Sequence, residues 1–147
     1  MSATEISGPE IVNSRCFAAT RERVFEAFSD PKELVKWFGP NGFTNTIQKF
    51  DLRAGGEWHL TMIAPDGAEY PNKWVFLEVA APKRIVAEHV RPVHRFVLTM
   101  LYEEEDGATR LTWRMHLERD EGEKMCGFFS AANEENFDRL AGHLANS

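Results

Sequence analysis

One stretch near the C-terminal end restricts the possible folds more than any other part of the chain. Residues 120–144 have the periodicity of one amphipathic helix, which would be roughly 36 Å long at about 1.5 Å per residue. Asp120 is a suitable N-cap, and Glu123 would complete a capping box. The apolar side would consist of Met125, Cys126, Phe129, Ala132, Phe137, Leu140 and Leu144. Because an apolar face of this size is unstable in water, the helix must cover a broad apolar surface.

The middle of the chain supplies such a surface. From residue 43 to residue 117 apolar and polar residues alternate, which is the pattern of half-buried strands. The predicted strands are 43–53, 57–64, 68–79, 84–91, 94–103 and 109–118. The turns between them are short and rich in Gly, Pro and Asp, so neighbouring strands should be antiparallel. Strand 68–79 alone has two competing apolar phases: Trp74 and Phe76 in one, and Val75, Leu77 and Val79 in the other.

The N-terminal part adds one strand and two short helices. Residues 9–17 alternate as a strand does, and helices are predicted over 21–28 and 31–37. The predicted capping residues are Thr20, Asp30 and Glu33. We therefore expect an α+β fold with a curved, seven-stranded antiparallel sheet, two short helices after the first strand, and a long C-terminal helix on the apolar face. At this length, residues 1–147 would form a single domain.

The composition narrows the class of function. The net charge of −6 and the absence of a local basic patch argue against nucleic-acid binding. No apolar run approaches the roughly 18 residues of a membrane span, and no signal peptide precedes the first strand. Cys16 and Cys126 lie far apart within apolar phases, so we expect buried, reduced thiols and a cytoplasmic protein, either a monomer or a homodimer.

A ligand cavity is the main functional hypothesis. A curved sheet touches a straight helix only along a line, so a hollow lined by Trp, Phe and Met is expected beneath the helix. The predicted ligand-binding residues are Trp37, Trp58, Leu60, Met62, Trp74, Phe76, His89, Phe96, Leu98, Met100, Trp113, Met115, Phe129, Asn133, Asn136, Phe137 and Leu140. For any one of these residues, ordinary core packing is the alternative. The two asparagines interrupt the apolar side of the helix, where their amides would bind a ligand's polar group or meet backbone carbonyls or water.

Two histidines are candidates for catalysis or metal binding. His89 shares a phase with Ile85 and Ala87, and is a candidate general acid–base or a satisfied core histidine. His94 would lie across a turn from it, but zinc needs three or four ligands, so no metal site and no cofactor is predicted. The surface histidines would be His59, His116 and His143.

Two polar groups are interpreted as structural. Residues 103–106 would form a solvated hairpin tip, because packed like charges repel one another. Arg53 would pair with Asp51 or cap carbonyl groups beside the Gly55-Gly56 turn. Neither glycine pair has the context of a phosphate-binding loop.

Five segments resemble one known family. They are Val24-Phe25 through Asp30-Pro31 to Trp37-Phe38-Gly39-Pro40 and Phe43; Asp51 to Trp58; Pro65-Asp66-Gly67; Phe76 to Val79 with Pro82 to Ile85; and Thr109 to Thr112. Together they resemble the SRPBCC (START-like) superfamily, and specifically its single-domain bacterial branch related to the activator of heat-shock protein 90 ATPase. The resemblance implies a helix-grip fold, in which an antiparallel sheet wraps the C-terminal helix around a hydrophobic cavity.

Members of the superfamily bind lipids, sterols, polyketides or aromatic compounds, and some catalyse cyclisation or dehydration. The resemblance therefore implies a binder of a small hydrophobic molecule, with a cyclase- or dehydratase-type enzyme using His89 as the alternative. A chaperone-associated interaction module is the third hypothesis. The cochaperones that name the branch have an additional N-terminal domain, whereas only about eight residues precede the first predicted strand here. Direct chaperone activation is therefore not expected.

Overall fold

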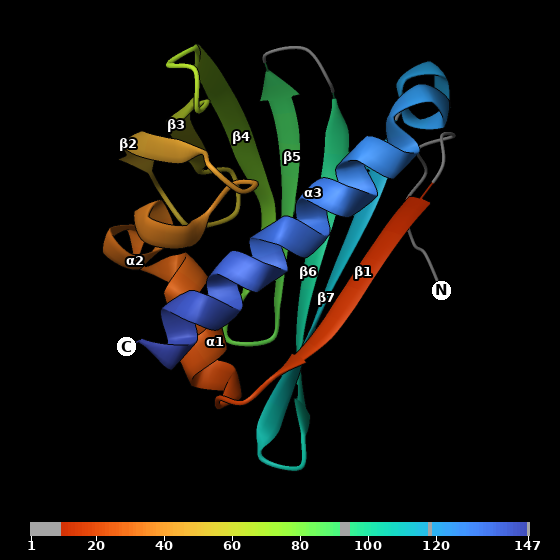
Figure 1. Ribbon diagram of the computed structural model, residues 1–147. Coiled ribbons are helices and arrows are strands. Elements are labelled where there is room, and N and C mark those ends of the chain that lie inside the picture. The colour runs from red at the N-terminus through yellow and green to blue at the C-terminus, as the bar shows by residue number, and fades with distance from the viewer. Residues whose placement is uncertain (1–9, 92–94, 118, 147) are drawn as a thin grey trace.

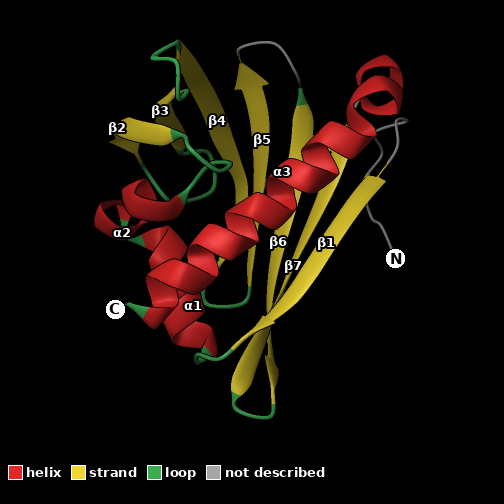
Figure 2. Cartoon of the chain, viewed as in Figure 1, coloured by secondary structure: helices red, strands yellow, loops and turns green. Residues whose placement is uncertain are grey.

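The computed structural model describes residues 10–91, 95–117 and 119–146, with the side chains of residue 91 and residues 119–126 left undescribed. Its elements are β1 (Glu10–Phe17), α1 (Arg21–Ser29), α2 (Pro31–Trp37), β2 (Thr44–Phe50), β3 (Glu57–Ile63), β4 (Glu69–Ala80), β5 (Arg84–Arg91), β6 (Phe96–Glu105), β7 (Ala108–Leu117) and α3 (Arg119–Ala145). All the predicted elements are present. Figure 2 shows helices gathered on one side of the strands, as expected for an α+β fold.

The sheet is antiparallel throughout, with the strand order β1-β7-β6-β5-β4-β3-β2. Strands β2 to β7 form a meander, and β1 joins the meander at the far end by pairing with β7. The chain reaches β2 at the opposite edge through α1 and α2, which cover one end of the concave face (Figure 1). The helix α3 runs diagonally across that face, giving the helix-grip arrangement. Its main neighbours in the described part of the chain are β1, β7, α1 and α2.

The helix ends follow the predicted chemistry only in part. Thr20 caps α1 by accepting a hydrogen bond from Arg23 N, and Asp30 caps α2 by accepting one from Lys32 N. The capping-box role of Glu33 is wrong, because its carboxylate pairs with Arg23 and His143 instead. The N-cap role of Asp120 is also wrong, because α3 already begins at Arg119.

A β-bulge resolves the two apolar phases of β4. Trp74 and Phe76 of the first phase are buried, whereas Leu77 of the second phase is 47% exposed. The register with β5 shifts after Phe76, so that Val79 pairs with the buried Ile85 and packs against the core. Each apolar phase is therefore correct for one half of the strand, since one extra residue turns the later side chains to the other face.

Candidate functional site

A cluster of aromatic rings fills the concave face of the sheet. Trp58 on β3 and Trp74 on β4 lie opposite one another and stack, with ring centroids 5.0 Å apart. Phe38, directly after α2, lies among three indoles, with its centroid 5.0 Å from Trp58, 6.5 Å from Trp74 and 6.4 Å from Trp113. Four elements, α2, β3, β4 and β7, thus meet around one phenyl ring.

The helix α3 joins this cluster at two points. Phe129 meets Phe96 at a centroid distance of 5.6 Å, and Phe137 meets Trp113 at 5.1 Å. Between these two positions α3 has no large apolar residue: its buried residues there are Asn133 and Asn136, and Ala132 is half-buried. The middle of the helix therefore places no large side chain of its own against the indole cluster.

Three of the four indole groups are buried donors without acceptors. The Nε1 atoms of Trp58, Trp74 and Trp113 are buried and form no hydrogen bond in the described part of the chain. Trp37 behaves differently, because its Nε1 donates to Ala27 O at 2.9 Å. Buried polar groups are nearly always satisfied in folded proteins, so three unsatisfied donors in one cluster need a physical explanation.

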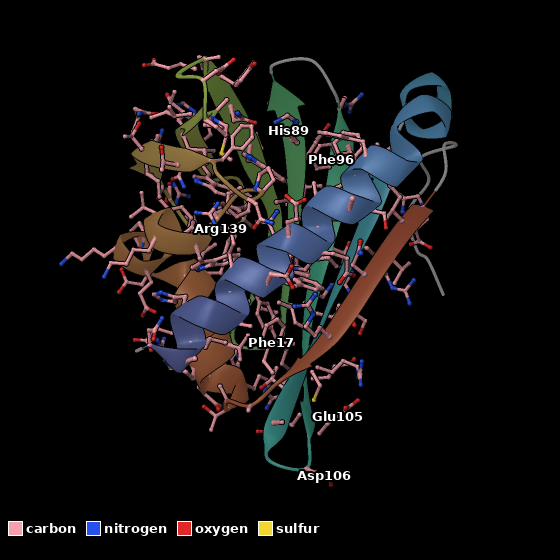
Figure 3. All side chains as sticks on the ribbon, in the orientation of Figure 1. Phe17, His89, Phe96, Glu105, Asp106 and Arg139 are labelled. Atoms are coloured by element: carbon pink, nitrogen blue, oxygen red, sulfur yellow. The ribbon has the colours of Figure 1, made fainter. Side chains whose placement is uncertain are left out.

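His89 lies at the edge of the same cluster, on β5 beside Phe96 on β6 (Figure 3). Its ring stacks on Phe96 at 4.8 Å and meets Trp74 edge-on at 4.9 Å. Asn72 Nδ2 donates to Tyr70 O at 2.7 Å, which directs Asn72 Oδ1 toward His89 Nε2 at 2.6 Å. Since an amide oxygen only accepts, His89 Nε2 is the donor in this contact. A catalytic role for His89 stays a prediction.

The two inward asparagines of α3 are both engaged with protein partners. Asn133 Nδ2 donates to Asn13 Oδ1 at 3.1 Å. Asn136 Oδ1 accepts from Gly39 N at 2.8 Å, and its Nδ2 donates to Ala132 O at 3.1 Å. The structure thus shows the second of the two alternatives for Asn136, a contact with the backbone. A contact of either amide with a ligand stays a prediction.

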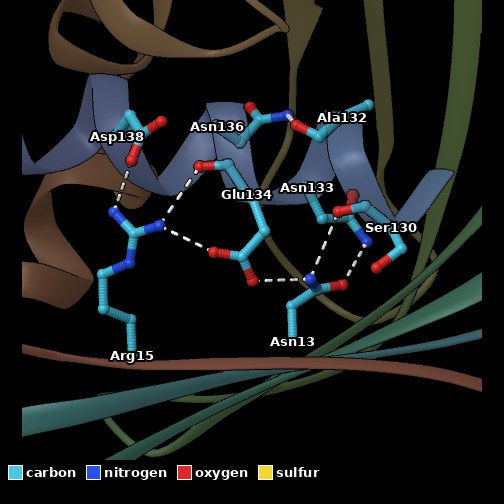
Figure 4. Close-up of polar contacts among 8 residues, drawn as sticks. All are labelled: Asn13, Arg15, Ser130, Ala132, Asn133, Glu134, Asn136 and Asp138. Carbon is cyan, nitrogen blue, oxygen red and sulfur yellow. Dashed lines mark hydrogen bonds and ion pairs between the residues drawn. The ribbon is translucent and has the colours of Figure 1, made fainter. Parts of the chain in front are cut away.

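A polar network holds α3 against the edge strand β1 (Figure 4). Asn13 Nδ2 donates to Glu134 Oε2 at 2.7 Å. Arg15 donates to Glu134 Oε1 at 2.7 Å and to Asp138 Oδ1 at 2.8 Å. The hydrogen bond from Asn13, followed by that from Arg15, lowers the pKa of Glu134 below its ordinary value.

This lowered pKa predicts a loss of stability in acid. A carboxyl group whose pKa is lower in the folded state stabilises the fold above its unfolded pKa, and the contribution disappears as the pH falls through the folded pKa. The free energy of unfolding, measured by urea titration at several pH values from about 6 down to about 3, should therefore fall less steeply in Glu134→Gln than in the wild type. Glu104→Gln, at the exposed β6–β7 hairpin, is the control and should keep the wild-type slope. Identical slopes for the wild type and Glu134→Gln would contradict the prediction.

The predicted ligand-binding residues are all on the inner side of the fold. Sixteen of them are buried, and Phe129 is half-buried. The structure gathers Trp58, Trp74, Trp113, Phe96, Phe129 and Phe137 around one cluster, whereas Trp37 faces α1 through its bond to Ala27. Two further residues of the site, Phe38 and Asn72, are absent from the sequence-based prediction. Phe38 lies outside the predicted helices and strands, and Asn72 is not among the predicted residues although it lies two residues before Trp74 on the same face of β4.

Several polar predictions need correction. Cys16 is an exposed free thiol, not a buried one, because it lies on the outer phase of the edge strand β1; the Cys126 side chain lies outside the described residues. His116 was expected at the surface but is 7% exposed, since Glu10 of the neighbouring strand lies beside it at 3.6 Å. His143 is largely covered by its contact with Glu33 at 2.8 Å.

One histidine considered for metal binding lies outside the described residues, whereas two predictions on charged groups can be checked. His94 lies outside the described residues, and within them no group of three His, Cys, Asp or Glu side chains is placed to hold a metal ion. Residues 103–106 are exposed, and Arg53 Nε donates to Asp51 Oδ2 at 2.9 Å, as predicted for both. No helix in the described ranges combines the length and the hydrophobicity that a membrane crossing requires.

Two surface hollows are described, and neither involves a residue of α3. One of about 410 Å³ lies between α2 and the edge strand β2, lined by Pro31, Val35, Ile47 and Phe50 among others. The other, of about 440 Å³, is lined by residues of β2, β3 and β4, including His59, Thr61 and Lys73. The hollow expected beneath α3 therefore stays a prediction.

Comparisons with known proteins agree with this fold. A sequence model for the family described as "Activator of Hsp90 ATPase homolog 1-like protein" matches residues 18–145. No curated protein matches the chain. A solution structure from Arthrobacter aurescens is similar with a TM-score of 0.88 and 22% identity, over 98% of this chain and 90% of that one. A crystal structure from Nitrosomonas europaea gives a TM-score of 0.83 and 23% identity, over 93% and 94% of the two chains. A crystal structure of a protein named AHSA1 from Silicibacter pomeroyi gives a TM-score of 0.76 and 23% identity, over 93% of this chain and 98% of that one. At these identities the structural likenesses establish the fold alone.

Proposed function

Because the chain belongs to the family of activator of Hsp90 ATPase homolog 1-like proteins, within the SRPBCC (START-like) superfamily, we propose that it binds a small hydrophobic molecule between α3 and the concave face of the sheet. The ligand would contain a hydrogen-bond acceptor, such as a carbonyl group. The superfamily commonly uses this side of the fold for hydrophobic ligands. The particular support in this chain comes from the indole groups.

The observation on which the proposal depends is the set of three unsatisfied donors on Trp58, Trp74 and Trp113. A buried donor without a partner costs about 1–3 kcal/mol. A ligand oxygen that accepts from one of these indoles would remove that cost. The aromatic walls would meanwhile bury the apolar part of the ligand, at about 25 cal/mol per Å² of apolar surface. A carbonyl-bearing hydrophobic molecule satisfies both requirements at once.

Indole N–H resonances provide a direct test. On titration with methyl decanoate, a neutral ester, the ¹H–¹⁵N signals of Trp58, Trp74 or Trp113 should shift downfield saturably, because a new acceptor deshields the proton. The signal of Trp37 should stay in place, since its N–H already bonds to Ala27 O. Equal small shifts of all four signals, or no saturation, would count against a bound ester.

Two matched variants then locate the ester. Ala132 is half-buried and lies one helical turn from both Phe129 and the inward-facing Asn136, whereas Ala131 beside it is exposed. Ala132→Phe should fill the space under α3 and abolish the saturable shifts, and Ala131→Phe should leave them unchanged. If Ala132→Phe binds methyl decanoate as the wild type does, the ligand is not beneath the middle of α3.

A further inference from the structure

The loop that follows α2 is bound to α3 through three side chains. Asn136 and Glu135 accept hydrogen bonds from the backbone N–H groups of Gly39 at 2.8 Å and Asn41 at 2.9 Å. Arg139 completes the contact, because its Nη1 donates to the carbonyl oxygens of residues 39 and 40 at 3.0 and 2.9 Å. All three side chains point from α3 toward this loop, away from the network that joins α3 to β1.

The charge of Arg139 is not balanced within the described part of the chain. Arg15 and Arg23, for example, both pair with carboxylates at 2.9 Å or less. Arg139 is half-buried and reaches only neutral carbonyl groups, with no carboxylate among the described residues in ion-pair contact. Burial lowers its pKa, which reflects the cost of keeping the cation partly away from water. A partly buried cation of this kind is stabilised by an anion.

The guanidinium group has the donors that an anion requires. Only Nη1 is used by the loop carbonyls, so the Nε and Nη2 donors make no hydrogen bond to any described residue. These two N–H groups lie along one edge of the planar guanidinium and form a fork that can bind the two oxygens of a carboxylate. The neighbouring carboxylate on the same flank, Glu135, is already bonded to Asn41 N.

Arg139 also lies next to the inner surface of the sheet. A Cβ atom placed on Gly39 would lie 2.7 Å from Met62 Cε and 3.5 Å from Arg139 Nη1, so both groups border the same glycine. Met62 is on the inner face of β3, four residues after Trp58. Figure 3 shows Arg139 on the side of α3 opposite to β1. The positive φ of 117° at Gly39 and the absence of a side chain there keep the two groups adjacent.

We propose that Arg139 binds the carboxylate of the ligand, which makes the ligand class a hydrophobic monocarboxylic acid. The acid group would occupy the Nε–Nη2 fork, and the apolar part would extend past Met62 toward the indole cluster. One bound carboxylate would neutralise one guanidinium, leaving no net buried charge. This inference rests on the proposed function, since it names the chemical class that the same site would bind.

The test compares two probes with the same tail. Decanoate and methyl decanoate are titrated at about pH 7.5, with indole fluorescence or calorimetry as the readout. The wild type should bind decanoate at least about tenfold more tightly than the ester, because only the acid forms a charge-assisted bidentate contact. Arg139→Gln should remove about tenfold or more of the decanoate affinity and change the ester affinity by less than about threefold. Arg15→Gln, which also removes a contact of α3, should leave the preference for the acid intact.

Each other outcome has a defined meaning. An equal loss of affinity for both probes in Arg139→Gln shows that Arg139 only binds the loop to α3, and this overturns the inference. Equal affinities of the wild type for acid and ester overturn it as well, while the proposed function stands. If the wild type binds neither probe, the proposed function fails and this inference fails with it.

Discussion

Phe137→Ala is expected to lower the free energy of unfolding by about 3–5 kcal/mol, the usual cost of removing a buried phenyl ring. Phe137 is completely buried in the middle of α3. Its ring meets Phe17 of β1 at 5.8 Å and Trp113 of β7 at 5.1 Å, and the guanidinium of Arg15 lies 5.5 Å from its centroid. One substitution therefore removes contacts of α3 with two strands, β1 and β7.

Urea unfolding followed by tryptophan fluorescence would measure this loss. A second phenylalanine of the same helix, Phe128, provides the control because it is 61% exposed. Phe128→Ala should change stability by less than about 0.5 kcal/mol. If the two variants are equally stable, α3 is not attached to the sheet through Phe137.

Gly56→Ala is expected to lower the free energy of unfolding by about 3 kcal/mol or more. This is at the upper end of the usual cost of adding a methyl group to a packed site, because the clash is with backbone atoms. A Cβ atom at Gly56 would lie 2.0 Å from Asp51 O and 3.0 Å from Arg53 O. The turn cannot open to admit it, since the N–H of Gly56 donates to Arg53 O and its carbonyl accepts from Phe76 N. The turn also positions Trp58, so the variant should disturb the indole cluster as well.

Two other glycines give a graded comparison by thermal or urea unfolding. Gly55 has a φ of 85° and open space around it, so Gly55→Ala should cost only the roughly 1–2 kcal/mol of a left-handed alanine. Gly142 lies in α3 with nothing near its would-be Cβ, and Gly142→Ala should stabilise the protein by about 0.5–1 kcal/mol. A Gly56→Ala variant no less stable than Gly55→Ala would show that the turn tolerates a side chain.

Local patterns were sufficient to predict most elements. The alternation of apolar residues and the turn residues between them located the strands to within a few positions, because both signals are contained in short segments. The Asp30-Pro31 pair located the start of α2 for the same reason. The capping function of Glu33 failed because Arg23 and His143, which are far away in sequence or on another element, compete for its carboxylate.

The candidate site was only partly accessible from sequence. Periodicity placed Trp58 and Trp113 on the inner face and left Trp74 in one of two competing phases. It contains no information on whether an indole N–H finds an acceptor. Helical periodicity does not single out Arg139, because it contains no information that the loop after α2 contacts that side of α3. Asn136 was recognised as inward-facing, whereas its partner Gly39, 97 residues away, became evident only in the structure.

The sequence by itself therefore determined the fold class, the seven strands and the inner face of every strand except β4, since hydrophobic periodicity and turn chemistry act between near neighbours. The tertiary structure decided the pairing of β1 with β7, the bulge that turns β4, and the environments of the three indoles and Arg139. These features depend on contacts between residues that lie far apart in the sequence. A group's charge balance or hydrogen bonding is a property of its neighbours in space, which local sequence does not contain.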